Sequence, residues 1–386
     1  MRVLQNINTL ILKIGSSLLT SSNEGINNEY INNIACTVSN IKKKIPNVLI
    51  VSSGAVAAGF KILGFKRRPK DIIDKQICAA VGQAKLIWYY EQAFEKYNIK
   101  VAQILFTKDD FANRRRFLNA RHGISKILKL GIVPIINEND IVVIDELKYV
   151  ETFGDNDNLS ALVSGLIEAD MLLMLSDVDG LFDSNPFKNT NARIISEVNS
   201  IEKDLKDIDF EDSPTVGTGG MRSKVAAAKK AIKYGCYAGI INGLDVNNIK
   251  RFLDGEDVGT FFNISLQRVK LKKFWLANAT ISKGDIIIDD GAIKAITNLN
   301  KSLLPSGVVG VRGKFDIGDI VRIISKNEIE IAKGKARYSS EDIKKIAGIN
   351  SKEIEKILGF KYSDEVVHKD DLIITLENII DNAKII

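Results

Sequence analysis

The chain has 386 residues, 45% of them hydrophobic and 26% charged, with a formal net charge of +6. This length can form one large and one small domain, and the composition is that of an ordinary globular protein. The modest positive charge does not indicate a dedicated nucleic-acid binder, and no apolar run or signal-peptide pattern predicts a membrane segment. The three cysteines, Cys36, Cys78 and Cys236, are widely separated and odd in number, which favours reduced thiols in a cytoplasmic protein.

The first two thirds of the chain alternate short apolar runs with helical patterns. The runs predict strands at 9–12, 48–51, 101–106, 133–136, 171–175, 239–241 and 260–263. The periodic segments predict helices at 28–44, 55–63, 74–97, 116–130, 159–167, 220–234 and 247–253. Because the strands are continuously apolar, we predict an α/β fold with a largely parallel sheet sandwiched by helices.

Polar residues follow the predicted strands where each strand ends. In parallel α/β sheets, ligands bind beyond the carboxyl ends of the strands, so these residues are expected to gather in one active site. They are Lys13 and Gly15, Ser53 and Gly54, Asn137 and Asp140, and Ser176 and Asp177.

Gly154-Asp-Asn-Asp-Asn158 stands at the start of the helix predicted over 159–167. A helix N-terminus favours either a capping Asp or Asn or a bound anion. Four consecutive polar residues exceed what one cap requires, so we interpret the stretch as part of a site. Just before it, 141–150 has the pattern of a β-hairpin, which is either a lid over a substrate or a simple insertion.

A second glycine-rich stretch, 217–224, leads into the helix predicted over 220–234. It does not match a Walker A sequence, so it is either a phosphate-binding loop or a flexible surface loop. Lys224 lies in the first turn of that helix, and Lys13 directly follows a buried strand. We interpret the two lysines as a positive clamp on a transferring phosphoryl group, held apart and oriented by Asp157.

The chain has only two histidines, His122 and His368, and neither lies in a catalytic-looking context. This disfavours hydrolysis that depends on histidine. It is compatible with phosphoryl transfer to a carboxylate, because such an acceptor is already an anion and needs no general base. The difficulty is then repulsion between two anions, which lysines and a metal ion relieve.

From about residue 271 the pattern changes to short β runs at 286–288, 308–311, 320–324 and 328–332. Gly284-Asp285 and Gly318-Asp319 are interpreted as turns between them. We therefore predict a large α/β domain over 1–264, a small mostly β domain over 272–370, and a short amphipathic tail over 371–386.

As a set, seven motifs resemble the amino acid kinase family, and within it the glutamate 5-kinases. They are Lys13-Ile-Gly-Ser-Ser, Ser52-Ser-Gly-Ala-Val-Ala-Ala-Gly59, Ala79-Ala-Val-Gly-Gln83, Arg116-Phe-Leu-Asn-Ala-Arg121, Asn137-Glu-Asn-Asp140, Gly154-Asp-Asn-Asp-Asn158 and Gly217-Thr-Gly-Gly-Met221. The C-terminal module, with Ser302-Leu-Leu-Pro-Ser-Gly307 and Gly313-Lys-Phe-Asp-Ile-Gly-Asp319, is similar to the PUA domain of longer bacterial members.

This resemblance implies ATP-dependent phosphorylation of the L-glutamate side-chain carboxylate to γ-glutamyl phosphate, the first step of proline biosynthesis. It implies Lys13, Lys224 and Asp157 as catalytic residues, and Ser53, Asp140 and Asn156 as glutamate-binding residues. The nucleotide site it implies consists of Lys13, Ser176, Asp177, Thr218, Gly219, Gly220, Met221, Arg222, Ser223 and Lys224. It further implies that Mg²⁺ takes part, without indicating which residues bind it, and that proline inhibits the enzyme by feedback. The implied partners are further copies of the chain, in a homodimer or homotetramer, and a glutamyl phosphate reductase. No association with a membrane is implied, and RNA binding by the PUA-like module is left open.

One stretch departs from the family pattern, since 141–153 is a few residues longer than in many relatives. This length puts glutamate affinity and proline sensitivity in doubt, but not the reaction. Three alternatives stay open: an N-acetylglutamate kinase or another amino acid kinase, an RNA-binding or RNA-modifying protein built around its PUA-like module, and an inactive kinase. The chemically demanding positions are all filled, which disfavours the last.

Overall fold

The computed structural model describes residues 4, 7–21, 25–67, 69, 71–142, 156–186, 189, 191–205, 220–263 and 282–375. Its contacts divide the chain into two compact units. One comprises Met1–Asp110 and Leu118–Val269, and the other Phe111–Phe117 and Lys270–Ile386. Each unit has its own sheet and its own buried core. Among the described residues, no helix combines the length and the apolarity that crossing a bilayer requires.

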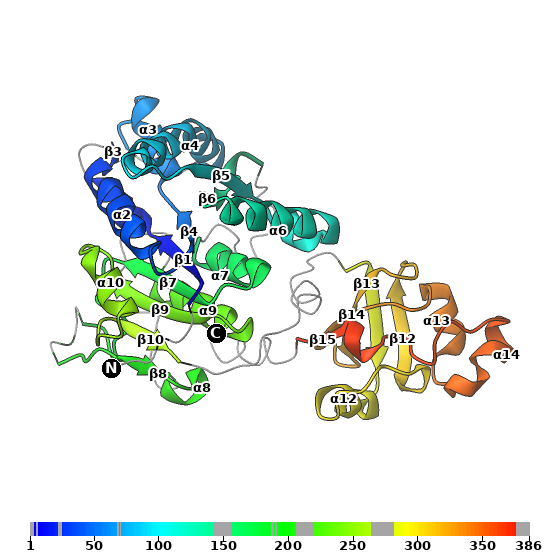
Figure 1. Cartoon of the computed structure of the whole chain (residues 1–386). Helices are drawn as coiled ribbons and strands as arrows, with labels where there is room; N and C mark the ends of the chain where they lie inside the picture. The colour runs from blue at the N-terminus through cyan, green and yellow to red at the C-terminus, as the bar shows by residue number, and fades with distance from the viewer. Residues whose placement is uncertain are drawn as a thin grey trace. The chain divides into compact units, whose positions relative to one another are not determined.

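The first unit is built on an eight-stranded sheet in the order β5-β6-β4-β1-β7-β9-β10-β8 (Figure 1). All neighbouring strands pair in parallel except β9 and β10, so the prediction of a largely parallel sheet is confirmed. The strands are β1 (Thr9–Ile14), β4 (Asn47–Ser52), β5 (Val101–Phe106), β6 (Val133–Glu138), β7 (Met171–Ser176), β8 (Glu197–Val198), β9 (Tyr237–Asn242) and β10 (Thr260–Phe262). A separate two-stranded ribbon joins β2 (Thr20–Ser21) and β3 (Gly25–Ile26).

Helices cover both faces of this sheet, with α2 and α10 on one side and α6 and α7 on the other (Figure 1). The helices are α1 (Ser16–Leu19), α2 (Asn28–Ile41), α3 (Ala55–Ile62), α4 (Ile72–Glu95), α5 (Lys108–Ala112), α6 (Arg114–Lys129), α7 (Asn156–Ile167), α8 (Ile201–Asp204), α9 (Met221–Lys233) and α10 (Asn247–Leu253). A short 3-10 helix, η1 (Asp140–Val142), follows β6.

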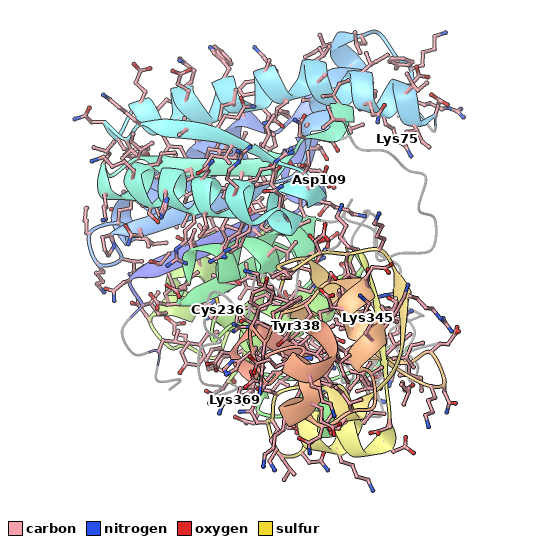
Figure 2. The ribbon with its side chains drawn as sticks, turned by 90° about the vertical axis from the view of Figure 1, so that its right-hand side faces the viewer. Lys75, Asp109, Cys236, Tyr338, Lys345 and Lys369 are labelled. Atoms are coloured by element: carbon pink, nitrogen blue, oxygen red, sulfur yellow. The ribbon has the colours of Figure 1, made fainter. Side chains whose placement is uncertain are left out.

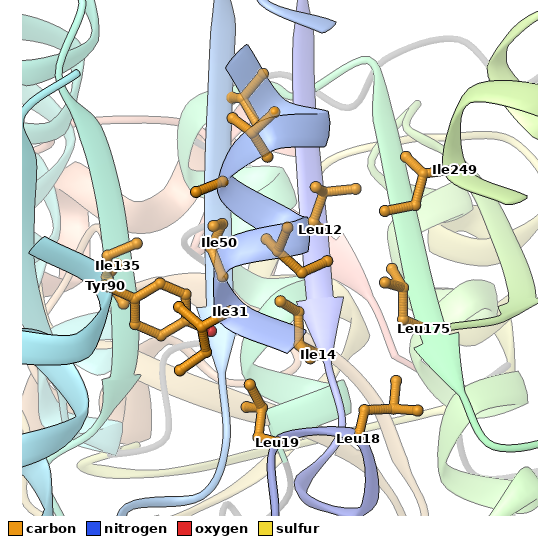
Figure 3. Packing of buried hydrophobic residues seen from close by; sticks show 14 of the residues in the cluster. Leu12, Ile14, Leu18, Leu19, Ile31, Ile50, Tyr90, Ile135, Leu175 and Ile249 are labelled. Carbon is orange, nitrogen blue, oxygen red and sulfur yellow. The ribbon is translucent and has the colours of Figure 1, made fainter. Parts of the chain in front are cut away.

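Side-chain alternation along β1 assigns its residues to the two faces. Leu10, Leu12 and Ile14 are fully buried in the cluster that packs on α2 and α4. Figure 3 shows Leu12 and Ile14 beside Ile31 and Tyr90 in this layer. Lys13 lies between two of these residues in the strand, so its side chain projects to the opposite face, where α7 begins.

The second unit is a five-stranded sheet in the order β12-β11-β13-β14-β15, and is mostly β as predicted. Its elements are β11 (Gly284–Ile288), α12 (Asp290–Thr297), η2 (Pro305–Gly307), β12 (Val308–Gly313), β13 (Ile320–Ser325), β14 (Glu330–Lys335), α13 (Ser340–Ile346), η3 (Ser351–Glu353), α14 (Ile354–Leu358), η4 (Lys369–Asp371) and β15 (Leu372–Ile374). Tyr338, labelled in Figure 2, is buried, and its hydroxyl donates to the Ser363 carbonyl at 2.5 Å. This contact holds the loop after α14 on the core of the unit.

Three local predictions differ from the structure. Gly284-Asp285 is not a turn but the start of β11, because Asp285 pairs in register with Arg312 and Arg322 of the neighbouring strands. Ile141 and Val142 belong to η1 rather than to a strand, and the rest of the predicted hairpin lies outside the described residues. In the predicted tail, Asp371 ends η4 and Leu372–Ile374 form β15, which pairs with β14, while 376–386 are not described.

Helices α3 and α4 touch backbone to backbone through two glycines. A Cβ built on Gly59 would lie 1.8 Å from the Cys78 carbonyl oxygen, and one on Gly82 would lie 1.9 Å from the Ala55 carbonyl oxygen. Real Cβ atoms do not come this close to another atom, so only glycine fits at either position. The Ala79–Gln83 motif thereby brings α4 directly against the helix that follows β4.

We expect Gly82→Ala to lower the free energy of unfolding by about 3 kcal/mol, because the new methyl group forces two backbones apart. The matched control is Gly123→Ala in α6, where a Cβ meets nothing within 4 Å. That change should raise stability by about 0.5–1 kcal/mol, since alanine is the better helix former. Urea unfolding followed by circular dichroism measures both variants, and equal stabilities for the two would contradict this account of the contact.

Candidate active site

The carboxyl ends of the central strands lie at one edge of the sheet. Ile14 at the end of β1 is in register with Ser52 of β4 and with Leu175 of β7. Ile136 of β6 pairs with Val51, which places Asn137 next to the same edge. Ser176, at the end of β7, pairs with Asn242 of β9. The sequence prediction that the polar strand ends gather at one edge is therefore confirmed by the register.

Asp157, in the first turn of α7, contacts both lysines that the sequence singled out. Its Oδ1 lies 2.5 Å from Lys13 Nζ, and its Oδ2 lies 3.5 Å from Lys224 Nζ. Lys13 comes from the end of β1 and Lys224 from the first turn of α9. Because α7 and α9 pack against each other, three segments far apart in the sequence meet on one carboxylate.

All three charged side chains of this triad are buried: Asp157 is 0% exposed, Lys13 4% and Lys224 5%. Burial alone would raise the pKa of Asp157, because it disfavours the charged form. The ammonium groups of Lys13 and Lys224, with hydrogen bonds from Lys13 and Ser223, outweigh burial and hold the pKa of Asp157 below its usual value. The carboxylate is therefore ionised and compensates part of the positive charge.

Ser223 has a contact that the sequence did not indicate. It was predicted to line the nucleotide site, and its hydroxyl lies 2.6 Å from Asp157 Oδ2 and 2.9 Å from the Gly220 carbonyl oxygen. The serine thus fixes Asp157 against the N-terminus of α9. The sequence signal for this contact is that Ser223 directly precedes Lys224. That signal is weak, because residue spacing does not show the direction of a hydroxyl in the first turn of a helix.

A group of amides and hydroxyls lies toward β4 and β6, which are on one side of β1 in the sheet. Asn156 Nδ2 donates to Ser53 Oγ at 2.9 Å, to Asn137 Oδ1 at 3.1 Å and to the Ser52 carbonyl oxygen at 3.3 Å. Asn137 Nδ2 donates in turn to Gln83 Oε1 at 2.8 Å. The structure therefore brings together Ser53 and Asn156, which the sequence proposed, and adds Asn137 and Gln83.

Asp140 begins η1, directly after β6, and η1 packs on α4. Burial raises the pKa of Asp140 to about 6, because it disfavours the charged form of the carboxyl group. A carboxylate of this kind gains from a cationic partner, such as an ammonium group.

The remaining candidate residues lie toward β7 and β9, which are on the opposite side of β1 from β4. Ser176 is buried at the end of β7, and its hydroxyl lies 3.3 Å from Asp177 Oδ1. The Gly243 N–H donates to the Ser176 carbonyl at 2.7 Å, and the Tyr30 hydroxyl donates to the Gly243 carbonyl at 2.8 Å. The loops after β7 and β9 are thereby held together.

The predicted glycine-rich stretch is only partly described. Gly220 is the N-cap of α9, Met221 is buried and Arg222 is exposed. Thr218, Gly219, Gly154 and the longer 141–153 stretch, except for 141–142, lie outside the described residues. In the part of the chain that the structure describes, no three or more His, Cys, Asp or Glu side chains cluster so that they could hold a metal ion.

Comparison with known proteins gives matches over nearly the whole chain. The model of the amino acid kinase family matches residues 8–242, and that of the PUA domain matches residues 284–358. A glutamate 5-kinase of Geobacter sulfurreducens is 46% identical over 372 residues, which are 96% of this chain and 99% of that protein. One of Carboxydothermus hydrogenoformans is 44% identical over 373 residues, with shares of 96% and 99%. Among solved structures, a UMP kinase of Bacillus anthracis covers 67% of this chain and 97% of its own, at 18% identity and a TM-score of 0.46.

We expect Asp157→Asn to lower the free energy of unfolding at pH 7 by about 3–5 kcal/mol, because it leaves two buried ammonium groups without their carboxylate. The pKa of Asp157 is lowered in the folded protein, so its contribution is complete above the unfolded value of about 4 and is lost as the pH falls through the folded value. The difference between variant and wild type should therefore shrink at about pH 3.5.

Urea unfolding at the two pH values measures this difference. The control is Glu91→Gln, an exposed position on α4, which should change stability by less than about 0.5 kcal/mol. Wild-type stability of Asp157→Asn at pH 7 would show that the carboxylate does not hold the two lysines.

Proposed function

Since the chain belongs to the amino acid kinase family, and its relatives over 96% of its length include glutamate 5-kinases, we propose that it catalyses the ATP-dependent phosphorylation of L-glutamate. The product is γ-glutamyl phosphate, which begins proline biosynthesis. The observation that carries this proposal is the convergence of Lys13 and Lys224 on Asp157, at the sheet edge where parallel α/β folds bind ligands.

The chemistry requires one anion to approach another. An oxygen of the glutamate side-chain carboxylate forms a bond to the terminal phosphorus of ATP, while the bond to the bridging oxygen of the leaving ADP breaks. No proton has to be removed, since the acceptor is already ionised. Lys13 and Lys224 stabilise the charge on the transferred group, and Asp157 keeps both ammonium groups oriented.

Strand order supports a division of the site into two halves. β1 lies between β4 and β7, and β6 and β9 lie one strand further out on either side. Ser53, Asn156 and Asp140 lie toward the β4–β6 half, which we assign to glutamate. Ser176, Asp177 and the N-terminus of α9, with residues 220–224, lie in the half that we assign to the nucleotide. Thr218 and Gly219, outside the described residues, are assigned to the same ligand from the sequence alone. Lys13 stands at the end of the strand between them.

Each half offers groups that suit its reactant. A helix N-terminus such as that of α9 attracts phosphate through free N–H groups and its dipole. In the other half, Asp140 offers a partly buried carboxylate to the glutamate ammonium group. The hydroxyl of Ser53 accepts from Asn156 and can donate its own hydrogen to a glutamate carboxylate, and the amide of Asn156 has a free oxygen that can accept from the ammonium group.

Mg²⁺ enters this proposal with the phosphates of ATP. The described residues do not fit a metal ion held by the protein alone, since they contain no cluster of three or more ligating side chains. Mg²⁺ is commonly bound by substrate phosphates, waters and one or two carboxylates. We therefore assign no protein ligand to it and no step to it.

Further parts of the proposal concern the setting of the enzyme. The free cysteines Cys36, Cys78 and Cys236 support a reducing compartment, and we place the protein in the cytoplasm. Feedback inhibition by proline, a homo-oligomeric state and coupling to a glutamyl phosphate reductase complete the proposal, and they rest on the likeness to glutamate 5-kinases.

We expect the purified protein, given ATP and Mg²⁺, to form γ-glutamyl hydroxamate from L-glutamate and hydroxylamine. Hydroxylamine traps the acyl phosphate product, so the signal requires phosphorylation of a carboxylate. N-acetyl-L-glutamate should give little product, and its preferential use would point to an N-acetylglutamate kinase instead. The assay is repeated with added proline, which should reduce the rate.

Two variants, compared in the same assay, test whether Lys224 takes part in the reaction. Lys224→Met keeps the apolar stem but removes the charge, and should lower kcat by about 100- to 1,000-fold. Lys250→Met on α10, whose side chain is 74% exposed, should leave kcat unchanged. Wild-type turnover by a folded Lys224→Met protein would exclude the lysine from the mechanism.

We expect the KM for glutamate to rise as the pH falls below about 6, the pKa of Asp140. Above that pH the carboxylate is ionised and can pair with the ammonium group, whereas below it the proton must be displaced. The side chain of free glutamate titrates near pH 4.3 and does not interfere. Asp140→Asn should raise this KM at pH 7.5 and flatten its dependence between pH 5 and 8, while the KM for ATP serves as the internal control. A wild-type KM for glutamate that is flat over this range would contradict the assignment of Asp140.

A further inference from the structure

Gln83 ends the Ala79–Gln83 motif, which the catalytic proposal leaves without a function. It lies on α4, is 7% exposed, and accepts a hydrogen bond from Asn137 through Oε1. The adjacent Gly82 presses the backbone of α4 against Ala55 of α3. Gln83 is therefore attached to a rigid helix that packs beside the end of β4.

The three side-chain amides form a chain whose direction is fixed at one end. The Ser52 carbonyl oxygen can only accept, so Asn156 must present its Nδ2 to it. The same Nδ2 donates to Asn137 Oδ1, and Asn137 therefore presents its Nδ2 to Gln83 Oε1. Rotating any single amide by 180° would set two donors or two acceptors against each other.

Among the described residues, this arrangement leaves one amide atom without a hydrogen bond at each end of the row of three amides. Asn156 Oδ1 and Gln83 Nε2 are both buried, and within the described part of the protein neither has a hydrogen-bond partner. Buried polar atoms are normally paired, so an unpaired atom beside a ligand site calls for an explanation. Asn156 Oδ1 can act only as an acceptor, and the group that would satisfy it is a donor.

We propose that Gln83 is a positioning residue for the acceptor substrate: by accepting from Asn137 Nδ2 it keeps Asn137 Oδ1 turned toward Asn156, and together with the Ser52 carbonyl oxygen this presents Asn156 Oδ1 to the ammonium group of an amino acid. This inference rests on the proposed function, since it concerns the half of the site assigned to glutamate. At neutral pH the ammonium group is the one hydrogen-bond donor that glutamate carries. Without the oxygen of Gln83, Asn137 is free to rotate, and the preferred orientation of Asn156 then depends on its 3.3 Å contact with the Ser52 carbonyl oxygen, so it is weaker.

The test compares L-glutamate with glutarate, which has both carboxylates but no ammonium group. In the wild type, kcat/KM should favour glutamate strongly. Gln83→Met, which keeps the volume but removes the oxygen, should lower that preference by about tenfold, the equivalent of one hydrogen bond to a charged group. The KM for glutamate should rise, while the KM for ATP and the KM for glutarate should stay within about twofold.

The matched control is Gln92→Met, an exposed position on the same helix, which should keep the wild-type preference. A Gln83→Met protein that keeps the preference would overturn the inference. So would equal changes in the KM for glutamate and the KM for glutarate, because a merely structural role would affect both acceptors alike.

A second variant covers the case in which Gln83→Met does not fold. Gln83→Ser leaves space for a water molecule that can pair with Asn137 Nδ2, so the fold is kept while the fixed oxygen is lost. It should show the same loss of preference, and wild-type preference would overturn the inference. The experiment distinguishes this inference from the proposed function. The proposed function would be contradicted by a wild type without glutamate-dependent turnover of ATP, whatever the Gln83 variants show.

Discussion

The active site depends on one buried carboxylate that holds two buried ammonium groups. Without a counter-ion, two ammonium groups in such a place would repel each other, and nothing would compensate the hydration that they lose on burial. Asp157 prevents this because each of its oxygens contacts a different lysine. The triad keeps a net charge of +1 when all three groups are ionised, which suits the proposed binding of a phosphate and a carboxylate beside it. The cost of burying these charges is repaid only if their geometry is accurate, and Ser223 contributes by holding Oδ2.

The geometry of the triad follows from the parallel sheet and from the helices that pack on it. Alternation along β1 sends Lys13 to the face where α7 starts, while its neighbours Leu12 and Ile14 anchor the strand in the core on the other face. The packing of α7 on α9 then brings the first turns of two helices to the same point. Stability and catalysis are therefore coupled, since whatever moves β1 relative to these helices also separates the charges.

Much of this arrangement could be predicted from the sequence, because it follows from patterns of short range. Continuous apolar runs gave the parallel strands, and polar residues at their ends gave the edge at which Lys13, Ser53 and Ser176 gather. Side-chain direction could not be predicted: Ser223 was assigned to the nucleotide but contacts Asp157. Gly284-Asp285 was taken for a turn because glycine and aspartate favour turns, whereas pairing on both sides of β11 places them in a strand. In each case, contacts between distant segments outweighed the local signal.

The two kinds of polar group in the site divide the work between them. In the proposed reaction, the lysine charges act most strongly on the group being transferred, whose charge distribution changes during the reaction, so we expect them to bear on kcat. The amide chain from Gln83 to Asn156 carries no charge and contacts Ser53 at the end of β4 rather than the triad. Such groups discriminate between ligands, because a fixed acceptor penalises a ligand that offers no donor. Because α4 packs against α3 through the glycine contact and also against α2, β5 and η1, the position of the amide chain depends on helix packing, and in the proposed function this packing bears on the choice of acceptor.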